Sequence, residues 1–143
     1  MIGKLLFSLQ VLAMTLCFFP ISLSFPSSLT LLFLALAAGL ALWVLIHNKL
    51  GNWSVLPLPK KGAQLITSGP YHFMRHPMYS SVIIATLAAI IHNQTLFAFF
   101  SWISLLIILN IKARYEERLL LMSFDRYQVY LNTVKTRFLP SLF

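Results

Sequence analysis

Four apolar segments of nearly membrane-spanning length dominate the chain, at residues 5–19, 28–46, 77–91 and 95–111. A helix needs roughly 20 apolar residues to cross the hydrocarbon core of a bilayer. Only 10% of the residues are charged, against roughly 25% in soluble domains. The sequence therefore predicts an all-α integral membrane bundle of about four transmembrane helices, with residues 1–143 forming a single membrane domain.

The basic residues are segregated along the chain. Lys4 precedes the first segment, four Lys and Arg residues lie between the second and third, and six follow the fourth. The connectors at residues 20–27 and 92–95 carry no charge. Because cytoplasmic loops carry an excess of Lys and Arg, this distribution predicts that both termini are cytoplasmic. The net charge of +8 thus indicates membrane orientation, and we expect no nucleic-acid partner.

A cleaved signal peptide is the alternative interpretation of the N-terminal segment, since Lys4 precedes an apolar stretch. No clear small-x-small cleavage site comes before Phe25, and cleavage would remove a helix on which the charge distribution depends. We therefore expect an uncleaved first helix. The compact chain favours a multi-pass protein of a bacterial or archaeal inner membrane, in contact with membrane lipids.

The first polar stretch, SGPYHFMRHPMYSS, leads into the third segment. Pro77 suits the first turn of a helix, which places Arg75 and His76 beside the free N–H groups of the helix start. These donors and the arginine form a receptor for an anionic group. Tyr71 and Tyr79 offer flat faces that stack on a heterocycle or contact a cation. The alternative is an interfacial belt that only anchors the helix at the headgroups.

The spacing of His72 and His76, four residues apart, raises the possibility of a metal site. We expect no helix from His72 to Pro77, and no cysteine or carboxylate lies nearby in the sequence. The sequence therefore predicts no metal site.

The second polar stretch contains two of the three acidic residues, Glu116 and Glu117, just beyond the fourth segment. Ionisable residues at membrane depth are functional candidates, and a carboxylate here could bind ribose hydroxyls, an ammonium group or a sulfonium. The alternative is a simple helical ion pair between Lys112 and Glu116. Because the third and fourth segments form a hairpin through residues 92–95, we expect the two polar stretches to meet at its cytoplasmic end.

The ordered set QLITSGPYHFMRHPMYSS, EERLL and FDRYQVYLNTVKTRFLP resembles the isoprenylcysteine carboxyl methyltransferase and phospholipid methyltransferase family. The resemblance covers roughly residues 64–140. It implies an S-adenosylmethionine-dependent membrane methyltransferase with a cytoplasmic helical tail. The acceptor would be lipophilic, with a carboxylate, amine or thiol group, and would enter from the bilayer. Ala63 and Phe124-Asp125 depart from the family pattern, in which some members have a histidine and Phe-Gly respectively.

The resemblance also implies roles for individual residues. It assigns cofactor binding to Leu65, Ile66, Tyr71, His76, Pro77, Met78, Tyr79, Glu116 and Glu117. A basic residue shortly before the acids, Lys112 or Arg114, matches the position that faces the substrate. We predict Arg75, His76 and Arg114 as the catalytic group. Arg114 would hold a carboxylate acceptor, whereas His76 or a glutamate would take a proton from an amine.

Two other functions remain as alternatives. A membrane reductase that uses NADPH would need further basic residues for the 2′-phosphate and usually a longer chain. A non-catalytic scaffold or small transporter subunit is the second alternative. Most ion-coupled pathways contain charged residues at membrane depth, and the four segments contain no acid, Lys or Arg.

Overall fold

The computed structural model describes residues 2–19, 22–48 and 64–139. Within these ranges every regular element is helical, as the sequence predicts. The elements are α1 (Ile2–Cys17), α2 (Ser28–His47), the 3-10 turn η2 (Gly69–His72), α3 (Pro77–Asn93), α4 (Leu96–Ser123) and α5 (Tyr127–Thr133). The first three predicted segments begin and end within one helical turn of α1, α2 and α3. The short α5 supplies the helical tail.

Helix α4 extends beyond the predicted apolar span, because it continues past residue 111 to Ser123. Its buried positions recur at helical spacing across that boundary, at Leu105, Leu109, Lys112, Ala113 and Glu117. The helix therefore keeps one packed face after its apolar run has ended. Its 28 residues correspond to about 42 Å, which exceeds the roughly 30 Å of a hydrocarbon core.

The hairpin turn is correspondingly shorter than the predicted residues 92–95. Helix α3 continues to Asn93 and α4 begins at Leu96, so only Gln94 and Thr95 connect them. Gln94 adopts a left-handed φ of 50°, and the Thr95 hydroxyl accepts a hydrogen bond from the Ala98 N–H at 3.1 Å. A left-handed residue followed by an N-cap hydroxyl thus turns the chain in two residues.

Two of the helices, α2 and α4, are long and apolar enough to cross a membrane. Helices α1 and α3 are apolar but shorter, with 16 and 17 residues. The long apolar helices indicate a membrane protein. The four-span topology and its orientation stay predictions.

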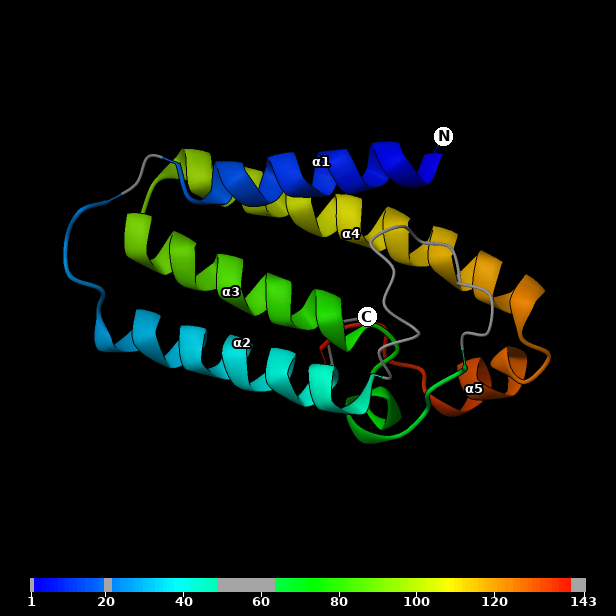
Figure 1. Cartoon of the computed structure of the whole chain (residues 1–143). Coiled ribbons are helices and arrows are strands. Elements are labelled where there is room, and N and C mark those ends of the chain that lie inside the picture. The colour runs from blue at the N-terminus through cyan, green and yellow to red at the C-terminus, as the bar shows by residue number, and fades with distance from the viewer. Residues whose placement is uncertain (1, 20–21, 49–63, 140–143) are drawn as a thin grey trace.

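Helix α3 is the central element, since none of its side chains is exposed. Helix α2 packs along one side of α3, and the paired helices α1 and α4 lie along the other (Figure 1). Helices α2 and α4 expose large apolar side chains on their outer faces, including Ile46 and Phe100. Exposed apolar surface of this extent suits contact with lipid.

The described basic residues gather at one end of the bundle. There α1 begins, α2 ends and α3 begins, beside η2, the last turns of α4 and α5 (Figure 1). Among the described residues, the Lys and Arg side chains at this charged end are Lys4, Arg75, Lys112, Arg114, Arg118, Arg126, Lys135 and Arg137. The opposite end, where α3 turns into α4, is the Asn93 end. The sequence predicted this segregation.

Candidate active site

A glycine sets the path of the chain into the site. Gly69 has a φ of +60°, and a Cβ atom at this position would lie 2.3 Å from Cδ2 of His47. Glycine adopts this left-handed conformation without strain, and it has no Cβ atom to collide with the His47 ring. The chain then makes the η2 turn and runs without helix through Arg75 and His76 to Pro77, which opens α3.

His76 lies between the two glutamates of α4. Its Nε2 is 3.2 Å from Oε1 of Glu117, and its Nδ1 is 3.6 Å from Oε2 of Glu116. Its ring stacks on Tyr79, with 2° between the ring planes and 5.4 Å between centroids. The Tyr79 hydroxyl donates to Oε1 of Glu116 at 2.5 Å. The two polar stretches therefore meet, as predicted.

Glu117 is almost completely engaged by protein donors. Arg137 donates from Nε to Oε1 at 3.1 Å and from Nη2 to Oε2 at 2.9 Å. Nε of Arg75 is 3.2 Å from Oε1, an ion-pair distance, but its N–H makes no hydrogen bond to a described residue. Glu117 lies beyond the predicted span that ends at residue 111.

The environment of Glu117 holds it in the ionised form. Burial raises the pKa of this carboxyl, but hydrogen bonds from His76 and Arg137 and the charges of His76 and Arg75 outweigh burial. Together they lower the pKa of Glu117 to about 2. An ionised carboxylate in this position attracts and orients the basic groups around it.

Glu116 is less enclosed than its neighbour. Its side chain is 19% exposed, against 10% for Glu117. Its Oε1 accepts from Tyr79, whereas its Oε2 is beyond hydrogen-bond distance of His76. Glu116 therefore retains an oxygen that could accept a hydrogen bond from a ligand.

Lys112 points into the bundle. It is 4% exposed, and its Nζ donates to Oε1 of Gln10 on α1 at 2.7 Å. The ammonium also lies 5.5 Å from the centroid of the Phe7 ring and 5.2 Å from that of Tyr79. The alternative of a simple helical ion pair between Lys112 and Glu116 is not formed as a direct contact, because Lys112 is buried and bonds to another helix. The charge of Glu116 still acts on Lys112: it raises the pKa of the ammonium, against the larger effect of burial, which lowers it.

Arg114 lies on the other side of α4, where it is exposed. Two residues correspond to about 200° of rotation around a helix, so Arg114 points away from the direction of Lys112. We name the group formed by His76, Glu116 and Glu117 with their partners the charged cluster. The structure brings Lys112 to this cluster, beside Tyr79, and leaves Arg114 outside it. The catalytic and substrate-binding roles of Arg114 stay predictions.

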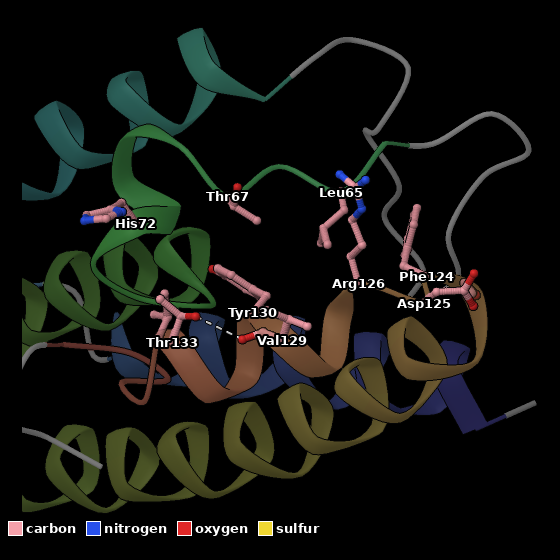
Figure 2. A pocket seen from close by; sticks show the side chains of 11 residues that line it. Leu65, Thr67, His72, Phe124, Asp125, Arg126, Val129, Tyr130 and Thr133 are labelled. Atoms are coloured by element: carbon pink, nitrogen blue, oxygen red, sulfur yellow. Dashed lines mark hydrogen bonds between the residues drawn. The ribbon is translucent and has the colours of Figure 1, made fainter.

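A pocket of about 760 Å³ opens at the charged end, between the chain ahead of η2 and α5 (Figure 2). This volume is typical of small-molecule sites, which span roughly 300–1,000 Å³. Its lining includes Leu65, Thr67, His72, Phe124, Asp125, Arg126, Tyr130 and Val134. His76 and the two glutamates lie outside this lining. The pocket and the charged cluster are therefore separate parts of the candidate site.

Tyr71 and Tyr130 connect the pocket to the cluster. The Tyr130 hydroxyl, on the pocket side, donates to the Tyr71 carbonyl at 2.6 Å. Burial, and then the charge of Glu116, raises the pKa of Tyr71 to about 12. The Tyr71 phenol thus lies in the field of Glu116.

The remaining predicted positions lie around this connection. Leu65 lines the pocket, Ile66 and Met78 are half-buried, and Pro77 is buried. Ala63, one of the departures from the family pattern, lies outside the described residues. His72 lines the pocket whereas His76 lies in the cluster. Within the described part of the chain, no three His, Cys, Asp or Glu residues are grouped so that they could hold a metal ion.

Sequence reasoning missed the partners that come from the two ends of the chain. Gln10 reaches Lys112 from α1, and Arg137 reaches Glu117 from the C-terminal segment. A lone amide in an apolar helix was the available signal for Gln10. Arg137 is 20 residues from Glu117, and its sequence context does not indicate the pairing.

The family model of the isoprenylcysteine carboxyl methyltransferase (ICMT) family matches residues 29–122. This range is more than half of the chain and includes all of α3 and all but one terminal residue of each of α2 and α4. It confirms the resemblance found in the motifs. A search of curated proteins found no match. Helix α1 and the C-terminal segment lie outside the matched residues.

Proposed function

Because this chain belongs to the isoprenylcysteine carboxyl methyltransferase family, and is thus a membrane methyltransferase, we propose that it transfers a methyl group from S-adenosylmethionine to a lipophilic acceptor. The observation that carries the proposal is the position of His76, held between Glu116 and Glu117 at the charged end. An interfacial anchor would need none of these buried polar contacts. The sulfonium of the cofactor supplies a methyl group that is already activated for transfer.

The described residues suit this cofactor. Leu65 and Val134 offer apolar surface in the pocket, and Tyr130 offers an aromatic face. The exposed Asp125 at the pocket could accept hydrogen bonds from an ammonium or ribose group. At the cluster, the partly exposed carboxylate of Glu116 attracts positive charge. The protein would mainly align the reactants and exclude water.

Lys112 favours an acceptor that carries an anionic group. Its ammonium is buried, and the hydrogen bond that it makes goes to the neutral amide of Gln10. Buried charges are normally paired. Glu116 acts on Lys112 through its charge, and an anionic group of the acceptor would add the direct ionic contact that the described residues do not supply. Among the three acceptor classes, this favours a carboxylate over an amine or a thiol. It also assigns to Lys112 the role first predicted for either Lys112 or Arg114.

The two reactants would reach the site from different directions. The charged end would face the cytoplasm by the positive-inside rule, which gives the polar cofactor access from water. The acceptor would enter sideways from the bilayer along the apolar faces of α2 and α4. Arg75 and His76 would act beside the reacting groups, and for an amine acceptor His76 would take the proton.

The test is a calorimetric titration of the detergent-purified full chain with S-adenosylmethionine, and with NADPH as the comparison ligand. We expect micromolar binding of S-adenosylmethionine alone, and substantially weaker binding by Glu116→Gln. Arg118→Ala, which changes an exposed arginine of the same helix, is the matched control and should bind normally. Binding of NADPH alone would support the reductase instead. Binding of neither ligand would overturn the proposal.

A further inference from the structure

The C-terminal residues 134–139, here named the strap, pair with the chain just ahead of α3. The backbone N–H of Arg75 donates to the Thr136 carbonyl at 3.0 Å, and that of His76 donates to the Arg137 carbonyl at 2.9 Å. These two bonds fix the backbone of the residues that precede α3. The strap lies outside the part of the chain that the family model matches.

The strap also covers the aromatic pair of the site. Phe138 is 4% exposed, and its ring centroid is 6.2 Å from that of His76 and 6.3 Å from that of Tyr79. The stacked rings of His76 and Tyr79 therefore have a wall supplied by the strap. Removal of water from these rings strengthens the electrostatic contacts beside them.

Arg137 connects the strap to α4 through all three guanidinium nitrogens. Nε and Nη2 bind the two oxygens of Glu117, and Nη1 donates to Oδ1 of Asn110 at 3.1 Å. A two-point arginine–carboxylate contact fixes the plane of the carboxylate as well as its position. Asn110 in turn fixes the guanidinium. Glu117 is therefore held in one orientation.

The oriented Glu117 carboxylate acts on His76. Its Oε1, which accepts from Arg137, is also 3.2 Å from Nε2 of His76. A carboxylate partner on one ring nitrogen decides which nitrogen carries the proton and how the ring is turned. Nδ1, the other nitrogen, faces Glu116. The chain of contacts thus runs from Arg137 through Glu117 to His76.

We propose that Arg137 is a positioning residue of the methyl-transfer site, which acts through Glu117 on His76 and leaves Glu116 as the glutamate that faces the ligand. This inference rests on the proposed function. Both oxygens of Glu117 accept hydrogen bonds from Arg137. Oε2 of Glu116, in contrast, is 3.6 Å from Nδ1 of His76, beyond hydrogen-bond distance. The two adjacent acids therefore have different tasks.

The proposal predicts a change in pH dependence when Arg137 is altered. The charged and titratable groups that face Glu117 are Arg75 and His76 ahead of α3, Arg137 of the strap, Tyr127 of α5 and Glu116 of α4 itself. Loss of Arg137 removes one cation and two donors from this set. Glu117 then takes up a proton at a higher pH, and His76 loses its charged partner there.

The experiment measures S-adenosylmethionine affinity against pH for the wild-type chain, Arg137→Ala and Arg137→Lys in detergent. We expect Arg137→Ala to weaken binding about tenfold or more at neutral pH and to move the acid limit of binding to higher pH. Arg137→Lys should lie between the two, because lysine keeps the charge but loses the two-point contact. Millimolar guanidinium should restore part of the binding by Arg137→Ala.

Two controls separate positioning from folding. Arg118→Ala should leave both the affinity and its pH profile unchanged. Asn110→Ala, which frees the guanidinium but keeps its contact with Glu117, should cause a smaller loss than Arg137→Ala. If Arg137→Ala does not fold, Arg137→Lys and Asn110→Ala still report on the same contact. Wild-type affinity and pH profile in Arg137→Lys would then overturn the inference.

A second readout does not depend on the cofactor. The ring signals of His76 are assigned by their loss in His76→Gln and recorded by NMR at neutral pH in the free protein. Because Arg137 orients the carboxylate that contacts Nε2 of His76, we expect the His76 ring chemical shifts to differ between the wild-type chain and Arg137→Lys. Unchanged ring signals would contradict the inference. Absence of S-adenosylmethionine binding by the wild-type chain, together with changed ring signals, would refute only the proposed function.

Discussion

At each end of the bundle, one polar side chain connects segments that are far apart in the sequence. This side chain is Asn93 at one end and Glu117 at the other. At the Asn93 end, Nδ2 donates to the Cys17 carbonyl at 3.3 Å and Oδ1 accepts from the Ser22 N–H at 3.2 Å. His92 Nε2 lies 3.2 Å from the Ser22 carbonyl. All of these contacts to Asn93 and His92 are with the neutral backbone.

At the charged end the bridge is ionic. Glu117 is an ionised carboxylate with basic partners from the chain ahead of α3 and from the strap. A buried charge carries a large desolvation cost, which its partners must offset. The Asn93 end shows that a neutral amide can join neighbouring segments without this cost. This difference is what we expect if the charged residues take part in the proposed methyl transfer as well as joining the segments.

The sharpest test of this comparison is the removal of Glu117. We expect Glu117→Ala to lower the free energy of unfolding by about 3–5 kcal/mol, because it leaves buried cations without a partner. Glu116→Gln should cost about 1 kcal/mol or less while it weakens binding of S-adenosylmethionine. Thermal unfolding in detergent measures both variants. Equal losses of stability would contradict the different tasks assigned to the two glutamates.

Acid should weaken the charged end before the Asn93 end. The pKa of Glu117 is lowered from an ordinary 4.5 to about 2 in the folded chain. A lowered folded pKa gives stability that is fully present above the unfolded value and is lost as the pH falls through the folded value. We therefore expect this contribution to disappear between about pH 4.5 and pH 2. The melting temperature against pH should lose this component in Glu117→Gln and keep it in Asn93→Ala.

A backbone substitution tests the turn that carries the charged end. We expect Gly69→Ala to cost about 2 kcal/mol or more, because the left-handed conformation alone costs roughly 1–2 kcal/mol for other residues. The new Cβ would also meet the His47 ring. Adding His47→Ala should recover the steric part only. Gly39→Ala on α2 is the control: a Cβ there meets nothing within 4 Å, so about 0.5–1 kcal/mol of stabilisation is expected.

At the Asn93 end we expect a smaller effect than at Glu117 or Gly69. Asn93→Ala removes two hydrogen bonds to backbone groups and should cost about 1–2 kcal/mol. The affinity for S-adenosylmethionine should not change, since the contacts of Asn93 do not involve the charged end. A large loss of affinity in a folded Asn93→Ala protein would show that the two ends are coupled.

The sequence predicted the helices well where they depend on local composition. The apolar run of α2 contains no Lys, Arg, Asp or Glu and is bounded by polar residues, Ser27 before it and Asn48 after it. The predicted bounds of residues 28–46 were therefore nearly correct. The predicted fourth span covers only part of α4, because the apolar run stops at Ile111 whereas the packed helical face continues to Glu117. The meeting of His76 with the glutamates was predictable, since an antiparallel hairpin brings those positions to the same end.

The sequence by itself determined the membrane class, the helical segments and the gathering of charge at one end. These properties depend on composition within short windows, and the bilayer acts on each segment in the same way. Only the tertiary structure decided that Lys112 points into the bundle and Arg114 away from it. It also decided that Arg137 points toward Glu117 and binds it. Such choices depend on helix rotation and on where distant segments return, and neighbouring residues along the chain do not specify either.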